Sequence, residues 1–180
     1  MKKLVGAAAI AAALAVASPT SARTPTCSTV SYSLIESSFN IAPTGTTIAK
    51  TSSGMRCTYY FFLNWPPGVP MRCPQPGSCA DGKPIGSMSV TFRAAATPTL
   101  YARALAAHVS LTSVRKVSGV GDAAFVGRDV NGGGGSLVFL RGTHLVSISV
   151  RDSYEGGGGP GTAGFSRAIE GFARTLVLRV

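Results

Sequence analysis

The chain is poor in the residues that usually carry enzyme chemistry. Only seven of its 180 residues are Asp or Glu, these are scattered, and only two are His. A glycosidase needs two carboxylates at one bond, and a zinc site needs clustered His, Cys or acidic ligands, so the spacing favours neither. A serine in a Gly-x-Ser-x-Gly turn is also lacking. We therefore predict no catalytic residues, no metal site and no cofactor.

The sequence also lacks an apolar run long enough to cross a membrane. Residues 4–17 are small and apolar and follow Lys2 and Lys3, but a spanning helix needs about 20 such residues. A basic start, a short apolar run and small residues ahead of Ala22 are typical of a signal peptide; the alternative, an N-terminal membrane anchor, would need a longer run. We predict a signal peptide over residues 1–22, cleaved near Ala22, and a single secreted or periplasmic domain of residues 23–180 with no transmembrane segment.

Four cysteines follow this segment, namely Cys27, Cys57, Cys73 and Cys79. An even number in an exported chain predicts disulfides, and four cysteines allow three pairings. We favour Cys73–Cys79, because the turn-rich residues between them bring their ends together, and Cys27–Cys57 then follows by elimination. A zinc site is the weaker alternative, because no Cys-x2-Cys spacing occurs.

Basic residues outnumber acidic residues in the chain as a whole. The formal net charge is +10, and loss of Lys2 and Lys3 with the signal peptide leaves +8. This balance favours an anionic cell-wall polymer, a lipid surface or an envelope protein as partner. The basic residues are scattered without interleaved aromatic residues, so we predict no nucleic-acid partner. No pattern indicates an oligomeric state.

The clearest structural signal lies in residues 117–150, which predict a strand, a glycine-rich loop and a hairpin. A type II′ turn at Gly142-Thr143 would place glycine where that turn needs it. This register pairs Arg141 with His144, and it sorts the apolar residues by face. One face then carries Leu137, Phe139, Val146, Ile148 and Val150, and the other carries Val138, Leu140, Leu145, Ser147 and Ser149.

Helices and further strands are expected on either side of this hairpin. A capping box from Ser33 to Glu36 predicts a helix over residues 33–40, and Thr97-Pro98 begins a second helix that ends near residue 110. A third helix, with a Glu170–Arg174 pair, is expected over residues 162–178. Residues 41–53 are interpreted as a loop. The strands are expected over residues 55–63, 87–93, 113–118, 123–127, 136–141 and 144–151.

This order predicts an α+β fold: a two-layer sandwich whose mostly antiparallel sheet is covered by two or three helices. We expect the two longer helices to cover the face that carries Leu137, Phe139, Val146 and Ile148. The motif Gly119-Val-Gly-Asp-Ala-Ala124 matches a dinucleotide fingerprint, which requires a helix to follow it. Because residues 125–127 read as strand, we interpret the motif as a bend in which Asp122 bonds its own turn.

The proline-rich residues 64–84 are the predicted recognition surface. Trp65 is the only tryptophan and has Pro66 and Pro67 beside it, and Arg72 adds a guanidinium group with several hydrogen-bond donors. We therefore assign binding to Trp65 and Arg72. The alternative is that Trp65 folds back onto the core. A small secreted serine hydrolase using His144 or His108, and a purely structural envelope protein, are the alternative functions.

Several motifs together resemble a known group. They are Cys27 ahead of a helix, Cys57-Thr-Tyr59, residues 117–124, the hairpin of residues 137–150, and a final helix rich in Ala and Arg. The chain resembles a small exported actinobacterial domain family of unknown function, which includes secreted proteins and lipoproteins and is related in outline to the extracellular sensor domains of mycobacterial kinases. The resemblance implies a compact α/β sandwich with a disulfide and a non-enzymatic binding or sensing role at the cell envelope. The chain departs from the family in lacking a lipobox cysteine and in carrying the proline-rich loop.

Overall fold

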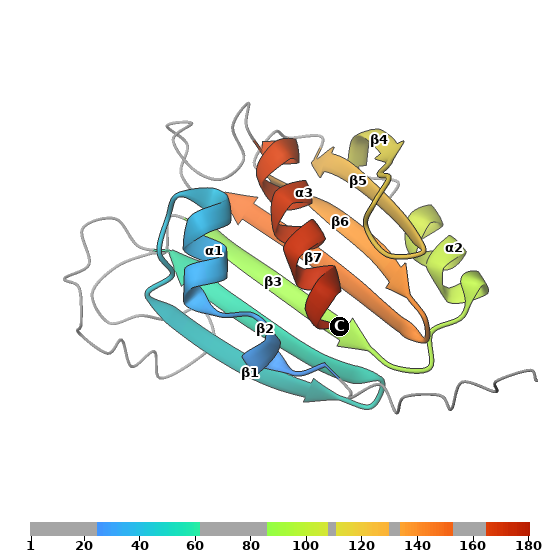
Figure 1. The fold of residues 1–180 in the computed structure, drawn as a ribbon, viewed down its shortest axis with the longest axis horizontal. Coiled ribbons are helices and arrows are strands. Elements are labelled where there is room, and N and C mark those ends of the chain that lie inside the picture. The colour runs from blue at the N-terminus through green and yellow to red at the C-terminus, as the bar shows by residue number, and fades with distance from the viewer. Residues whose placement is uncertain (1–24, 62–85, 108–110, 130–133, 153–164) are drawn as a thin grey trace, which may run out of the picture.

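A single antiparallel sheet of seven strands organises the described part of the chain (Figure 1). The computed structural model describes residues 25–61, 86–107, 111–129, 134–152 and 165–180. The strand order is β1-β2-β3-β7-β6-β5-β4. The strands are β1 (Gly45–Thr51), β2 (Gly54–Phe61), β3 (Gly86–Arg93), β4 (Leu111–Lys116), β5 (Ala123–Asp129), β6 (Gly134–Arg141) and β7 (His144–Asp152). The helices are η1 (Cys27–Thr29), α1 (Tyr32–Phe39), α2 (Pro98–Ala107), α3 (Phe165–Leu176) and η2 (Val177–Arg179).

Two helices, α1 and α3, lie side by side on one face of the sheet (Figure 1). They meet through the rings of Phe39 and Phe172, whose centroids are 5.8 Å apart. Beneath them lies the main core, which takes alternate residues from the strands. Its fully buried members include Met88, Val90, Leu137, Phe139, Val146, Ile148, Ile169 and Phe172.

The second long helix, α2, lies on the opposite face, and the expectation that it would share a face with α3 is wrong. Its residues Leu100, Tyr101 and Ala104 pack on a separate apolar cluster of Ala96, Phe125, Val138, Leu140 and Leu145. The physical reason is that the outward residues of β6 are themselves apolar and need a cover. The α+β class with a mostly antiparallel sheet is confirmed, and α1 takes the place beside α3 that was assigned to α2.

The hairpin between β6 and β7 has the predicted register. Arg141 lies opposite His144, Phe139 opposite Val146, and Leu137 opposite Ile148. Gly142 has φ of +54°, which is the sign that the first central residue of a II′ turn needs. The two predicted faces are also present, because one contributes to the main core and the other to the cluster under α2.

The loop predicted over residues 41–53 is wrong, because it contains strand β1. This strand pairs along its whole length with β2, from Gly45 opposite Tyr60 to Thr51 opposite Gly54. It forms an edge of the sheet, and its residues Ile48, Ala49 and Lys50 are exposed. An exposed edge strand lacks the apolar alternation by which a strand is recognised in sequence, and charged Lys is a common residue at such edges.

Two local predictions around the helices are also corrected. The N-cap of α1 is Ser31 rather than Ser33, and its hydroxyl accepts a hydrogen bond from the Leu34 N–H at 3.2 Å. Glu170 of α3 pairs with Arg115 of β4 rather than with Arg174, because α3 lies over that end of the sheet. The predicted cap of α2 is present, since the Leu100 N–H donates to Thr97 Oγ1 at 3.2 Å.

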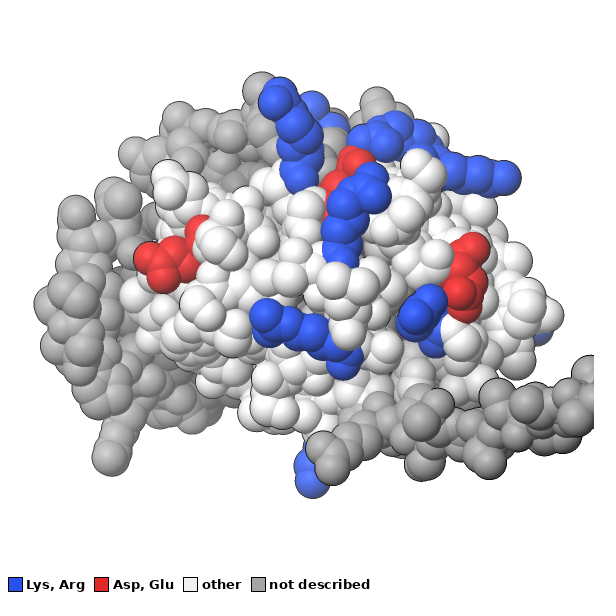
Figure 2. Space-filling view, in the orientation of Figure 1, with Lys and Arg blue, Asp and Glu red and all other residues white. Residues whose placement is uncertain are grey.

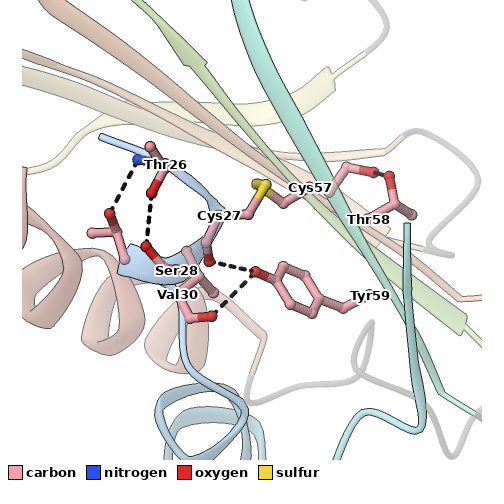
Figure 3. Close-up of a disulfide and its surroundings, with 9 residues drawn as sticks. Thr26, Cys27, Ser28, Val30, Cys57, Thr58 and Tyr59 are labelled. Carbon is pink, nitrogen blue, oxygen red and sulfur yellow. Dashed lines mark hydrogen bonds between the residues drawn. A yellow bond between two sulfur atoms is a disulfide. The ribbon is translucent and has the colours of Figure 1, made fainter. Parts of the chain in front are cut away.

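A disulfide between Cys27 and Cys57 ties the N-terminal segment to β2 (Figure 3). The predicted pairing is confirmed for these two cysteines, whose Cα atoms are 5.6 Å apart. Beside it, the hydroxyl of Tyr59 lies within hydrogen-bond distance of the carbonyls of Cys27 and Val30, at 3.3 and 3.2 Å. The N-terminal segment is therefore held by a covalent bond and by a buried donor on the same strand.

Three regions named in the sequence predictions fall outside the described residues. They are the signal segment of residues 1–22, the proline-rich loop with Trp65, Arg72, Cys73 and Cys79, and the residue His108. The predictions made for them, including the Cys73–Cys79 disulfide, stay predictions.

Removal of the Cys27–Cys57 disulfide should lower stability substantially. The bond closes a loop with a sequence separation of 30 residues, for which chain entropy gives about 3–4 kcal/mol. We expect the Cys27→Ala/Cys57→Ala variant to lose about that much in urea unfolding followed by circular dichroism. Reductant should destabilise the wild type in the same direction. A variant within about 1 kcal/mol of the wild type would contradict this assignment.

Stability should also fall at alkaline pH because of Tyr59. Burial, and to a smaller extent the nearby Tyr32, raises the pKa of Tyr59 from 10.0 to about 12. The unfolded chain therefore releases this proton first, so stability is full below pH 10 and is lost between pH 10 and 12, by about 2–3 kcal/mol. Urea unfolding at a series of pH values should show this fall in the wild type and in Tyr60→Phe, the matched substitution. Tyr59→Phe should lack it, and an equal fall in Tyr59→Phe would contradict the assignment.

Candidate functional site

Helix α2 covers only part of the sheet face opposite α1 and α3, and the uncovered part of that face is polar. Strands β2, β3 and β7 alternate strictly, so that every second residue enters the main core and the residues between point to the other face. In β3, Met88, Val90 and Phe92 are buried. Apart from Gly54 and Leu145, the residues at the outward positions of these three strands are Arg, Ser, Thr or Tyr: Arg56, Thr58, Tyr60, Ser87, Ser89, Thr91, Arg93, Ser147, Ser149 and Arg151.

The strand register brings the hydroxyl groups of this face into rows. Thr58 lies opposite Ser89, Ser89 opposite Ser149, and Ser149 opposite Ser136 of β6. The hydroxyls of Thr58 and Ser89 are 3.0 Å apart, and those of Ser136 and Ser149 are 3.3 Å apart. Each residue in the row therefore has a hydroxyl neighbour, and a hydroxyl group can both donate and accept a hydrogen bond.

A groove of about 360 Å³ lies on this face. We call it the arginine groove, and it is lined by Arg56, Ser87, Ser89, Thr91, Arg93, Ser147, Ser149 and Arg151. The three arginines are exposed, and the serines and threonines are half-buried. Among the described residues, the lining contains no carboxylate, no histidine and no aromatic side chain.

Among the side chains that the structure describes, none forms an ion pair with an arginine of the groove. The two ion pairs found among these side chains are Arg115–Glu170 and Arg141–Asp122, and neither involves a groove arginine. The face covered by α1 and α3 shows both acidic and basic side chains (Figure 2). The described lining of the arginine groove therefore differs from that face in carrying charge of one sign only.

This arrangement is suited to holding an oxyanion. A guanidinium group offers a planar fork of donors that matches carboxylate, sulfate or phosphate oxygens. Serine and threonine hydroxyls can both donate and accept, and so can bind an anion or the hydroxyl of a sugar. Proton transfer needs a group that titrates near neutral pH, and the described lining residues of the groove supply none. The described lining therefore offers hydrogen-bond donors and positive charge to an anion.

The dinucleotide-like motif belongs to the scaffold. The chain continues from it into strand β5, as predicted, and not into a helix. Gly121 has φ of +59°, and a Cβ there would lie 2.2 Å from the carbonyl oxygen of Leu140, so a side chain is excluded by both strain and space. Asp122 accepts a hydrogen bond from the Gly142 N–H at 2.6 Å, so it braces the β6–β7 turn rather than its own turn.

His144 lies in a different place from the arginine groove. It is buried on the sheet face that α1 and α3 cover, and it lines a smaller cavity of about 230 Å³. The described lining of that cavity includes Lys50 and Thr51 but no carboxylate. Asp152 lies at the other end of β7, about 26 Å along the strand from His144. The alternative of a serine hydrolase that uses His144 or His108 stays a prediction.

The sequence predictions missed the arginine groove. They placed a strand over residues 87–93, and they placed Ser147 and Ser149 together on one face of the hairpin, but they did not show that β3 and β7 are neighbours in the sheet. Strands distant in sequence give no pairing signal in a single sequence. The usable signal was the shared pattern in which Ser, Thr and Arg alternate with apolar residues, at residues 56–58, 87–93 and 147–151.

Comparison of the chain with protein-family models, with curated proteins and with solved structures finds no match. The resemblance to the exported actinobacterial family therefore stays a prediction. In the described residues, no helix is long and apolar enough to cross a membrane, and no group of three or more His, Cys, Asp or Glu is placed to hold a metal ion.

Removal of the groove arginines should stabilise the protein at low ionic strength. The backbones of Arg56 and Arg93 are diagonal neighbours about 8 Å apart, so their charges repel each other. We expect the Arg56→Gln/Arg93→Gln variant to gain up to about 1 kcal/mol in urea unfolding at low salt. The gain should disappear above about 0.2 M salt, where such charges are screened. A difference that does not depend on salt would contradict this electrostatic origin.

Proposed function

We propose that the chain is an exported, non-enzymatic binding domain of the cell envelope that takes an anionic ligand in the arginine groove. The observation that carries the proposal is the set of three arginines on one sheet face, with hydroxyl groups between them and no carboxylate in the described lining. Charge of one sign around a concave surface concentrates ligands of the opposite sign.

Export is supported by the sequence and by the disulfide. Residues 1–22 have the pattern of a signal peptide, and a structural disulfide such as Cys27–Cys57 is typical of chains that fold in an oxidising compartment. The formal net charge of +10 is in keeping with a partner that carries negative charge. The resemblance to exported binding and sensing domains points the same way.

The proposal gives a direct localisation experiment. Pyrophosphate titrated into ¹⁵N-labelled protein at constant ionic strength should shift the amide resonances of β2, β3 and β7 in a saturable manner. The Arg56→Gln/Arg93→Gln/Arg151→Gln variant should lose these shifts. A matched variant that removes three exposed charges elsewhere, Arg103→Gln/Lys116→Gln/Arg167→Gln, should keep them.

The comparison of the two triple variants decides the assignment, because both lose the same net charge. Shifts that spread over the whole surface, or that weaken equally in the two variants, would mean that pyrophosphate follows net charge and that the groove is not a site.

A further inference from the structure

The arginine groove has two separate cationic poles. Arg93 stands at the end of β3, and Arg56 lies diagonally beside it on β2. Arg151 stands at the other end, opposite Ser87. Because Arg93 lies six positions after Ser87 in β3, the backbones of Arg93 and Arg151 are about 20 Å apart, and those of Arg56 and Arg151 are about 17 Å apart.

The surface between the poles is neutral and rich in hydroxyl groups. Along β3, Ser87, Ser89 and Thr91 precede Arg93 at every second position, and along β7, Ser147 and Ser149 precede Arg151. These five side chains are half-buried, so they form the floor of the groove while the arginines rise at its ends. The floor therefore presents hydrogen-bonding groups over its length and charge only at its two ends.

Because of this separation, a single compact anion can reach only one of the two poles. With the guanidinium groups standing out from the sheet, a ligand that engages both poles needs anionic groups on the order of 10–20 Å apart. The part of such a ligand between its anionic groups faces hydroxyls, which bind other hydroxyls well and offer no apolar contact. The ligand is then a chain that bears both oxyanions and hydroxyl groups.

We infer that the arginine groove binds an extended anionic polysaccharide segment, whose acidic groups meet Arg56 with Arg93 at one end and Arg151 at the other, and whose sugar hydroxyls meet the Ser and Thr floor. This inference rests on the proposed function and names its ligand class. The acidic groups are carboxylate, sulfate or phosphate, and the N–H groups of a guanidinium fork can donate hydrogen bonds to any of the three. A single-stranded nucleic acid fits less well, because such ligands stack their bases on aromatic side chains, and none is found in the described lining.

Length dependence of binding tests the inference. Galacturonate and its di-, tetra-, hexa- and octasaccharide are titrated into the protein by calorimetry at constant ionic strength. The mono- and disaccharide can reach one pole only, whereas the longer chains can reach both and gain from the second contact. We expect the affinity for the hexasaccharide to exceed that for the disaccharide by at least about tenfold.

Variants at the two poles separate the contributions. Arg151→Gln should abolish the increase of affinity with oligosaccharide length and leave the affinity for the disaccharide nearly unchanged. Arg56→Gln/Arg93→Gln should weaken all lengths. Arg167→Gln, which removes an exposed charge on α3, is the matched control and should retain the full gain with length.

Several outcomes would overturn the inference. One is an affinity that does not change with oligosaccharide length. Another is that Arg151→Gln and Arg167→Gln lose the increase of affinity with length to the same extent. Tighter binding of an oligothymidylate of similar length, or of anionic phospholipid vesicles, would assign the groove to nucleic acid or to a membrane instead. If the pyrophosphate shifts still localise to the groove in these cases, only the ligand class is wrong. If they do not localise, the proposed function is wrong as well.

Discussion

The pairing of β3 with β7 is the contact on which the rest of the molecule depends. The two strands are far apart in sequence but central in the sheet, and each alternates apolar with polar residues. With Val90 opposite Ile148, both side chains enter the core, and Thr91 opposite Ser147 faces away from it. A slip of one residue would bury hydroxyls under α3 and expose the core. One register thus defines both the core and the groove.

Much of the fold could be read from the sequence because its signals are local. The turn at Gly142, the alternation in β3 and the cap at Thr97 each act within a few residues, and all are present in the structure. Edge strand β1 was missed because an edge needs little apolar alternation. The face chosen by α2 was missed because it depends on which strand surfaces remain apolar after the sheet has formed, which is a property of the assembled sheet.

The candidate site was harder to foresee than the fold, for a related reason. Arg56, Thr91 and Ser147 are adjacent across three strands, yet β7 lies more than 50 residues beyond β3 in the chain. Sequence reasoning instead favoured Trp65 and Arg72, since proline and aromatic residues stand out in a linear reading. Outward serines and threonines look like ordinary solvated positions until their strands are placed side by side.

The floor of the groove is backed by a dense core, and this affects how it meets a ligand. Behind Ser87, Ser89 and Thr91 lie Met88 and Val90, both with no exposed surface. The strands that carry the hydroxyls therefore pack against the core on their other face, and close-packed interiors resist deformation. A ligand would have to order the long arginine side chains but not the floor, so most of the entropy of association would be lost at the two ends. Discrimination between ligands would then arise from how well a chain matches a fixed template rather than from the protein's adjustment to it.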